Sequence, residues 1–568
     1  MIRSLALSLA LIALPLAACA QTAPPPETAS RSMAGVVSAA DPRAAEAGRE
    51  ILRAGGSATD AAMAMMLALT VVEPQSSGIG GGGFFVRHDA ATGTPTTIDG
   101  RETAPSNATP DLFLDEDGRP LGFRQAVPGG RSVGIPGNIR LMGEAHRRWG
   151  RLEWAQLFEP AIRLAEDGYA VNARMARFLG FFSEIWESFP DARAIYWEDG
   201  APKEEGDIVR NPALAALLRR VAEQGPDSFY SGENVAAIQA ATANSAINPV
   251  TIPAEDFASY RAVERAAVCR SYRGFRICGM GPPSSGATTV LQILGMIERF
   301  DMGALGAQSP EAWHLIGEAM RLAYADRAMY LGDSDFVSVP VDGLLDPDYI
   351  AERSALISET RALDSYDAGT PPGSEARTAG LDGEIAGTTH FVAADGDGNV
   401  VTMTSTVEGP FGSQLIANGY ILNNELTDFD FTPERDGAPV ANAVAPGKRP
   451  LSSMSPTLVY DADGQLILAL GSAGGRRIIM HVAKTLIGVL DWGLPVDEAI
   501  ALPNIYFGGD SLRIEESTFL DDMRSALSQR SGLVVASGLT SKVNAVQWTG
   551  DGWFGAADPR SPGVALTE

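Results

Sequence analysis

The sequence predicts a layered fold in which helices cover β-sheets, of the α/β or α+β class. Two observations lead to this prediction. From about Ser132 to Leu363 the apolar residues recur mainly at helical spacing, whereas from Thr388 onward they alternate with a period of two, as in HFVAAD and VVTMTST. A strand pair around Cys269 interrupts the helical part. Blocks of helices and strands within one chain pack as layers.

The chain before this helical part supplies two helices, a loop and a hairpin. AAEAGREILRAGG predicts a helix that Gly55 and Gly56 end, and ATDAAMAMMLALTVVE predicts a second helix that begins after Ser57. The second helix is apolar all around, so it must be almost entirely buried. The glycine-rich loop PQSSGIGGGG then leads into FFVRHDAATGTPTTIDGRE, which we expect to form a hairpin.

Composition indicates a globular protein and argues against nucleic-acid binding. The chain has 568 residues, of which 45% are hydrophobic, so it can bury a large core. Its 70 acidic residues outnumber its 44 basic ones along the whole chain and give a net charge of -26. Phosphate binding needs a basic stripe, so we expect no nucleic-acid partner.

The N-terminus has the pattern of an export signal. Its apolar run from Leu5 to Leu16 is too short to span a bilayer as a mature helix. The sequence Leu-Ala-Ala-Cys that follows resembles a bacterial lipobox, which implies removal of residues 1–18 and attachment of a lipid to Cys19; the alternative is ordinary cleavage after a small residue. Residues 19–35 would form a flexible linker. We therefore expect a periplasmic protein, either soluble or anchored by the lipid on Cys19.

Two further cysteines, Cys269 and Cys278, lie in VCRSYRGFRIC, where β-type residues flank a Tyr-Arg-Gly turn. In an oxidising compartment they could form a disulfide across this hairpin, and two unpaired buried thiols fit the pattern equally well. Neither outcome decides the function.

Several common chemical motifs are absent or stand in the wrong context. Gly78, Gly80 and Gly83 match the spacing G-x-G-x-x-G, but they follow a helix and precede a strand, the reverse of the dinucleotide-binding context. The turn DGDGN has Val400 where an EF-hand loop needs glycine, and the five histidines show no metal-ligand spacing. There is no G-x-S-x-G elbow and no Walker loop. We expect no metal or cofactor, and a hydrolase would need a nucleophile that supplies its own base.

A set of ordered motifs carries a resemblance to a known family. In the N-terminal part they are GGSATDAAMAMMLALTVVEPQSSGIGGGGF, DGRETAP, SVGIPG, EPAIRLAEDG, PPSSG and AYADRAMYLGD, and in the C-terminal part GTTHFVAADGDGNVVTMTST, ILNNELTDF, GKRPLSSMSPTLV, GSAGGRRII and ADPRSPG. From about Val36 to the C-terminus they resemble the γ-glutamyltransferase (glutathione hydrolase) family of N-terminal-nucleophile enzymes. The resemblance implies an α+β fold, a four-layer αββα sandwich formed jointly by a large and a small subunit after self-cleavage.

The resemblance also implies that the precursor cuts itself between Gly387 and Thr388. The large subunit would span residues 36–387 and the small catalytic subunit residues 388–568. A threonine hydroxyl is a weak nucleophile, but the new terminal α-amine has a pKa of about 7.7–8.0 and can accept the hydroxyl proton at physiological pH. Thr406 matches the residue that hydrogen-bonds the nucleophile. Outside this motif, both threonines would be ordinary strand residues.

The same register assigns residues to the γ-glutamyl headgroup, which carries an α-carboxylate and an α-ammonium. Arg101 in DGRETAP matches the carboxylate-binding arginine, a role that suits a guanidinium because it can donate two parallel N–H groups. Ser452 and Ser453 match the serine pair that holds the same carboxylate. Glu425 and Asp428 in NNELTDF match the positions that bind the ammonium. The alternatives are a surface ion pair for the arginine, a turn for the serines and solvated loop charges for the acids.

Gly474 and Gly475 match the family's oxyanion hole, where backbone N–H groups stabilise the charge on the attacked carbonyl oxygen. Glycine would let the backbone approach closely, and a plain tight turn is the alternative. One departure is Glu408, because the family commonly has asparagine there. Its carboxylate could bind an ammonium more strongly but would repel an α-carboxylate, which leaves the preferred acyl group open. We expect His390, beside the nucleophile, to pack and not to act as a base.

These features predict a self-processing γ-glutamyltransferase and glutathione hydrolase. Attack by Thr388 on a γ-glutamyl amide would form an acyl-enzyme ester, and the acyl group would pass to water or to an amino acid or peptide, with glutathione as the leading substrate. One alternative is a related acylase of another acyl amide, of the glutaryl-cephalosporin type. The other is a non-catalytic surface lipoprotein that keeps the fold as a binding module. The segment DFTPERDGAPVANAV, where some members carry a tyrosine-bearing lid, is short and leaves the acceptor open.

Overall fold

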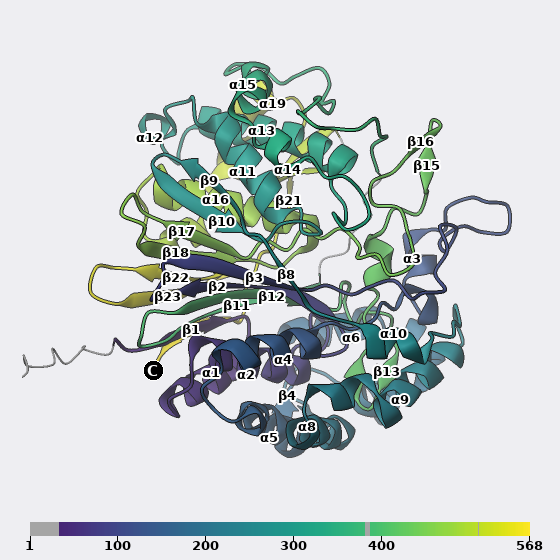
Figure 1. Ribbon diagram of the computed structural model, residues 1–568. Coiled ribbons are helices and arrows are strands. Elements are labelled where there is room, and N and C mark those ends of the chain that lie inside the picture. Colours follow the sequence, from purple (N-terminus) through teal and green to yellow (C-terminus); the bar gives the residue numbers. More distant parts are fainter. Residues whose placement is uncertain (1–32, 381–386, 509) are drawn as a thin grey trace, which may run out of the picture. The chain divides into compact units, whose positions relative to one another are not determined.

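The computed structural model describes residues 33–380, 387–508 and 510–568. The expected export signal, Cys19 and most of the expected linker lie outside these ranges. Within the compact unit Met33–Glu568, the described residues form two large antiparallel sheets with helices on either side (Figure 1). The mixed α/β class predicted from the sequence is confirmed.

One sheet has seven strands in the order β24-β1-β11-β12-β2-β3-β8. In that order the strands are Val564–Thr567, Val36–Ala39, Thr389–Ala394, Val400–Thr406, Gly82–Asp89, Thr94–Gly100 and Val263–Arg265. Strand β11 follows the predicted cleavage point, and its Thr389 pairs with Ser405 of β12. Thr406 of β12 in turn lies opposite Gly82 of β2. The chain after the predicted cleavage point therefore enters an inner strand, whose position is fixed by pairing on both sides.

The second sheet has six strands in the order β23-β22-β18-β17-β10-β9. In that order they are Trp553–Ala557, Asn544–Trp548, Leu466–Gly471, Thr457–Tyr460, Phe275–Gly279 and Val268–Tyr272. Strands β9 and β10 are the predicted pair around Cys269, with Cys278 opposite Cys269 in their register. A disulfide joins these two cysteines, so the alternative of two unpaired thiols is wrong.

Strand β11 shows how the period of two builds the core. Phe391 and Ala393 belong to one buried hydrophobic cluster, whereas Val392 and Ala394 belong to another. Successive side chains of a strand point to opposite faces of its sheet. One face of β11 accordingly packs against helix α2 (Ala58–Val72), and the other packs against strand β18 of the second sheet. Because both faces are covered, the whole strand is buried.

Helix α2 lies against the middle of the seven-stranded sheet, and all 15 of its residues are buried, as its composition predicts. It begins after Ser57: the Ser57 hydroxyl accepts from the N–H of Asp60, and the Asp60 carboxylate accepts from the N–H of Ser57. The preceding helix α1 ends at Arg53, just before the two predicted stop glycines. These two predictions are confirmed.

Further helices cover both outer faces. In Figure 1, α1 (Pro42–Arg53), α4 (Asn138–Trp149), α5 (Glu159–Asp167) and α8 (Pro212–Gln224) lie with α2 on the side of the seven-stranded sheet, and α11 (Gly286–Ile297), α13 (Pro310–Tyr330), α15 (Pro347–Ala355), α16 (Ile478–Leu490) and α19 (Arg524–Ser531) lie on the side of the other. The sequence did not predict the two-residue ladders β4–β7 and β5–β6, which pair Tyr169–Ala170 with Ile208–Val209 and Trp197–Glu198 with Ala201–Pro202. Strands this short have no periodicity to detect.

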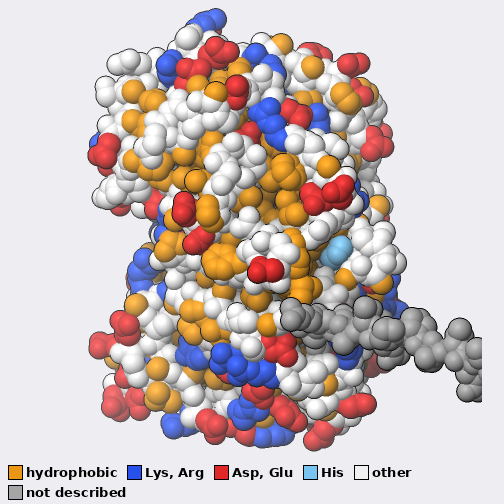
Figure 2. Space-filling view, turned by 90° about the vertical axis from the view of Figure 1, so that its left-hand side faces the viewer, with side chains coloured by type: hydrophobic (Ala, Val, Ile, Leu, Met, Phe, Trp, Pro, Cys, Tyr) orange, Lys and Arg blue, Asp and Glu red, His pale blue; other side chains and the backbone are white. Residues whose placement is uncertain are grey.

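The surface is charged over both layers of helices. On the face drawn in Figure 2, acidic side chains lie among Lys and Arg side chains, above and below a central area richer in hydrophobic ones. The acidic excess is thus distributed over this face, as the sequence indicates. Across the described ranges, no helix is both long enough and apolar enough to cross a membrane.

Candidate active site

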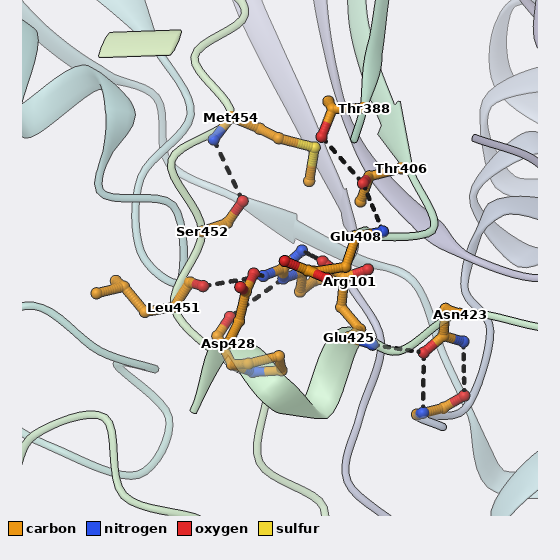
Figure 3. A network of polar contacts seen from close by, with 12 residues as sticks. Arg101, Thr388, Thr406, Glu408, Asn423, Glu425, Asp428, Leu451, Ser452 and Met454 are labelled. Atoms are coloured by element: carbon orange, nitrogen blue, oxygen red, sulfur yellow. Dashed lines mark hydrogen bonds and ion pairs between the residues drawn. The ribbon is translucent and has the colours of Figure 1, made fainter. Parts of the chain in front are cut away.

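Thr388 lies at the entry of β11 and is almost fully buried. Its N–H donates to the carbonyl oxygen of Ser76 at 2.9 Å, and its hydroxyl oxygen lies 3.0 Å from that of Thr406 (Figure 3). Its φ of +76° falls in the left-handed region, where a β-branched residue is strained. Two other segments therefore hold Thr388, the loop after α2 and the end of β12.

Thr406 ends β12, and the backbone fixes its side chain in turn. The N–H of Glu408 donates to the Thr406 hydroxyl oxygen at 2.8 Å. This bond uses one acceptor position of the hydroxyl and leaves its own hydrogen able to point at the Thr388 oxygen. A hydrogen bond in that direction stabilises negative charge on the Thr388 oxygen, as an attack on a carbonyl group requires.

Gly387, on the other side of the predicted cleavage point, has no room for a side chain. A Cβ atom there would lie 1.8 Å from the carbonyl oxygen of Glu408. In the glycine-rich loop, a Cβ on Gly81 would lie 1.9 Å from the carbonyl oxygen of Thr406. Only glycine allows such close backbone approaches. The predicted cleavage point and the glycine-rich loop are thus packed against the same strand end.

Arg101 lies fully buried after β3, bound to the two acids predicted to hold the ammonium group. Its guanidinium forms ion pairs with Glu425 and, at 2.5 Å, with Asp428. It also donates to the carbonyl oxygens of Pro450 and Leu451 at 3.1 and 2.9 Å. Burial alone would lower the pKa of Arg101, but the two carboxylates outweigh it and raise the pKa. Arg101, Glu425 and Asp428, three of the residues predicted to bind the headgroup, therefore form one cluster (Figure 3).

Glu102, which the sequence analysis did not single out, adds a further buried carboxyl group to this cluster. Burial raises the pKa of Glu102 to about 7, while Arg101 opposes the shift. Burial also raises the pKa of Glu425 well above its ordinary value, and the charges of Glu102, Asp428 and Glu408 add to this effect. Carboxyl groups this close disfavour one another's ionised form, which adds to the effect of burial on their pKa values.

Glu408 links the threonine pair to the Arg101 cluster. Its backbone N–H binds Thr406, its charge acts on Glu425, and its carboxylate accepts a hydrogen bond from the side chain of Asn424. Its φ is +73°, and its side chain is buried. In Figure 3 it lies between the threonines and Arg101. Glu408, at the position where the family commonly has asparagine, thus lies at the centre of the site.

Ser452 and Ser453 directly follow Leu451, which binds Arg101. The Ser452 hydroxyl accepts from the N–H of Met454 at 3.2 Å, and its carbonyl oxygen accepts from the N–H and the hydroxyl of Ser285, each at 2.7 Å. The Ser453 hydroxyl accepts from the guanidinium of Arg327 at 2.9 Å. Arg327 and Ser285 lie in the motifs AYADRAMYLGD and PPSSG, which indicate the family but no role for either residue.

Gly474 and Gly475 adopt φ values of +129° and +63°, which explains why glycine occupies both positions. They stand where β18 leads into the short 3-10 helix η6 (Gly475–Arg477). A cavity of about 260 Å³ is lined by both Gly474 and Gly387. Gly474, the first of the two predicted oxyanion glycines, therefore faces the same space as the predicted cleavage point.

Lys542 supports the loop that holds Thr388, and the sequence analysis did not single it out. Its ammonium group lies 3.2 Å from the Ser76 hydroxyl and from both carboxylate oxygens of Glu73. Burial lowers the pKa of Lys542 to about 8. Because the Ser76 carbonyl binds the Thr388 N–H, Lys542 is linked to Thr388 through one residue.

His390 contacts strand β12. Its Nδ1 lies 2.9 Å from the Thr404 hydroxyl and its Nε2 lies 3.1 Å from the Thr402 hydroxyl. Burial lowers its pKa to about 3, so it is neutral at physiological pH. These contacts agree with a packing role. In the part of the chain that the structure covers, no group of three or more His, Cys, Asp or Glu side chains is arranged to hold a metal ion.

Most of the chain matches a known protein family. The model of the γ-glutamyltranspeptidase family matches residues 44–567. The chain belongs to this family. The resemblance found in the motifs is therefore confirmed, although the family by itself does not assign a role to each residue.

Relatives within the family differ in what they act on. The glutathione hydrolase proenzyme of Escherichia coli (strain K12) is 38% identical over 94% of this chain and 91% of its own. The acylase ACY 1 proenzyme of Pseudomonas sp. (strain V22) is 37% identical over 95% of this chain and 94% of its own. The crystal structure of the cephalosporin acylase from Bacillus halodurans superposes with a TM-score of 0.83, at 27% identity, over 96% of this chain and 98% of that one. A glutathione hydrolase and an acylase are thus about equally similar to this chain in sequence, and an acylase is also similar to it in fold.

Proposed function

We propose that the protein is a self-processing γ-glutamyltransferase and glutathione hydrolase in which cleavage before Thr388 creates the nucleophile. The main support is the threonine pair: the hydroxyls of Thr388 and Thr406 lie 3.0 Å apart, next to a peptide bond whose first residue can only be glycine. An ordinary threonine at the start of a strand needs neither feature. The mature protein would be a heterodimer of residues 36–387 and 388–568, folded as the four-layer sandwich of N-terminal-nucleophile hydrolases.

The chemistry follows from the new chain end. Cleavage turns the N–H of Thr388 into an α-amine, which accepts the hydroxyl proton while the oxygen attacks the γ-carbonyl group. N–H groups at Gly474 and Gly475 stabilise the oxyanion, at about 3 kcal/mol for each donor. The departing amine takes up the proton, and an ester on Thr388 remains. Water or a second amine then attacks this ester and releases the acyl group.

The Arg101 cluster favours an amino-acid headgroup over a glutaryl group. The guanidinium and the two serines would bind the α-carboxylate, and Glu425 and Asp428 would bind the ammonium. A γ-glutamyl headgroup carries one charge of each sign, so it enters the cluster without changing the net charge. A glutaryl group brings only a negative charge to a cluster that already contains several carboxyl groups, which Coulomb repulsion opposes.

Denaturing gels and N-terminal sequencing test the self-processing. Wild-type protein should give two bands, of roughly one third and two thirds of the full mass, and the smaller should begin Thr-Thr-His. Thr388→Ala should give one full-length band and no turnover. A wild-type protein that persists at full length would support the binding lipoprotein instead.

An acylase of another acyl amide is the second candidate, supported by the acylase relatives and by Glu408 in place of the usual asparagine. Purified mature protein should release 4-nitroaniline from its γ-glutamyl anilide faster than from the glutaryl anilide. Activity on the glutaryl anilide alone would overturn the proposed substrate in favour of the acylase.

We also propose that the protein acts in the periplasm, attached to a membrane by a lipid on Cys19. Cys19→Ala should then move the protein from the membrane fraction to the soluble fraction. Equal distribution of the two proteins would refute the lipid anchor but would leave the enzymatic proposal intact.

A further inference from the structure

The cavity of about 260 Å³ beside the predicted cleavage point is lined by several cationic side chains, in a protein of net charge -26. They come from helix α6 (Ala173–Phe181), from η6 and from the segment before β22. These elements are far apart in the sequence. The four cationic residues are Arg174, Arg177, Arg477 and Lys542.

Lys542 and Arg174 of this cavity differ in how the described residues surround them. Lys542 pairs with Glu73 at 3.2 Å. The Nε atom of Arg174 is buried and has no hydrogen-bond partner among the described residues. Burial lowers the pKa of Arg174; Glu73 opposes this shift, and the charges of Arg177 and Arg477 add to it. A bound anion would satisfy the buried N–H and offset the repulsion between the cations.

An aromatic groove adjoins the cationic cavity. Arg174, Arg177, Phe178 and Phe181 recur at helical spacing on α6, so they share one face of the helix. The two guanidinium groups lie 5.0 and 5.5 Å from the centre of the Phe178 ring. A second cavity, of about 820 Å³, shares Arg177 and Phe178 with the first, contains Phe181 and extends to Glu408. Phe181 is 68% exposed.

We propose that the cationic cavity binds the carboxylate of the amine that leaves the acyl group, and of the amine that accepts it in the reverse of the same step. This inference rests on the proposed function, in which the carboxylate of the γ-glutamyl headgroup is already bound at Arg101. The cationic cavity, which Gly474 also lines, would bind a second carboxylate on the leaving-amine side of the attacked amide. The aromatic groove takes the apolar body of the same amine. Arg174 and Arg177 would therefore make the enzyme prefer γ-glutamyl amides whose leaving amine carries a carboxylate over those of neutral amines.

Self-cleavage produces another carboxylate that could occupy this cavity, the new C-terminus at Gly387. In that case the arginines would hold the end of the large subunit and would have no contact with substrate. Their removal would then leave the discrimination between charged and neutral leaving groups unchanged.

Two chromogenic substrates separate these cases, γ-glutamyl 4-nitroanilide and γ-glutamyl 3-carboxy-4-nitroanilide, which differ by one carboxylate on the leaving amine. The ratio of kcat/KM for the carboxylated over the neutral substrate should fall about tenfold in Arg177→Gln and in Arg174→Gln, which corresponds to about 1.4 kcal/mol. Arg177 is exposed, so we expect Arg177→Gln to fold and mature. If Arg174→Gln fails to mature, Arg177→Gln alone tests the inference. Arg219→Gln is the matched control, because Arg219 pairs with Glu166 at the surface, and its ratio should equal that of wild type.

An unchanged ratio in the matured Arg177→Gln protein would overturn the inference, and turnover of both substrates would still support the proposed function. Failure of the wild-type protein to turn over either substrate would refute the proposed function and the inference together. A fall in the ratio that also occurs in Arg219→Gln would assign the effect to general surface charge and would likewise overturn the inference.

Discussion

Replacing Thr406 with valine removes one hydroxyl group and nearly preserves the shape of the side chain. Two contacts are lost, the 3.0 Å contact with Thr388 and the 2.8 Å acceptor for the N–H of Glu408. A buried N–H without an acceptor costs about 1–3 kcal/mol of stability. The bond to the Thr388 oxygen strengthens as that oxygen gains charge, so its loss should raise the barrier by about 1.5–3 kcal/mol, or slow the reaction roughly 10- to 100-fold.

Two rates measure this effect, because self-cleavage and turnover use the same oxygen atom in the proposed mechanism. The loss of the full-length band on a gel follows the first, and release of 4-nitroaniline from γ-glutamyl 4-nitroanilide by the matured protein follows the second. Thr406→Ser should restore most of both rates. Thr404→Val is the control, since it removes a buried hydroxyl of the same strand that contacts His390 at 2.9 Å, and it should lower stability without slowing either rate. A folded Thr406→Val protein that cleaves and turns over at wild-type speed would refute the reasoning.

Three other perturbations test separate parts of the site. Gly387→Ala should leave the precursor uncut, because the new Cβ would lie 1.8 Å from the Glu408 carbonyl oxygen; two bands on a gel would contradict this. Arg101→Lys keeps the charge but cannot bind two carboxylates and two carbonyl groups at once, so KM for γ-glutamyl 4-nitroanilide should rise about tenfold or more, and an unchanged KM would exclude Arg101 from headgroup binding. Burial lowers the pKa of His390 to about 3, so below about pH 6.5 the folded state binds fewer protons than the unfolded state. The free energy of unfolding therefore decreases as the pH decreases, by up to about 1.4 kcal/mol per pH unit. The melting temperature should therefore fall more in wild type than in His390→Gln between about pH 7 and pH 5, and equal falls would be evidence against this assignment.

Local sequence patterns predicted the elements that position Thr388. The period of two after Thr388 corresponds to β11 and β12, and the turn DGDGN between them sets their pairing, in which Asp395 accepts from the N–H groups of Asp397 and Asn399. Such a hairpin brings its two ends together, so the proximity of Thr388 and Thr406 follows from local rules. The capped start of α2 is equally local. Here neighbouring residues determine the structure.

Local sequence patterns did not predict the contacts between segments that are far apart in the sequence. The ion pair of Arg101 with Glu425 joins residues 324 apart in the sequence, and the bond of Lys542 to Ser76 joins residues 466 apart. Motifs placed Arg101 and Glu425 in the same site, but they did not indicate that the two side chains bind each other. Lys542 stands outside every motif. Its contact depends on how the segment before β22 packs against the loop after α2, which no pattern near Lys542 indicates.

The backbone at Thr388 would connect the proposed self-cleavage with the proposed catalysis. A φ of +76° costs a residue other than glycine about 1–3 kcal/mol, and the precursor maintains it because the Thr388 N–H is bound to Ser76 while Gly387 is packed against Glu408. This torsion exists only while the carbonyl group of Gly387 is attached to the Thr388 nitrogen, so the proposed cleavage would remove the strain together with the bond and would be favoured by that amount. The contact with Thr406 involves only side chains and does not depend on the broken bond. After the proposed cleavage, the Thr388 hydroxyl would therefore stay in contact with Thr406, next to the newly formed amine.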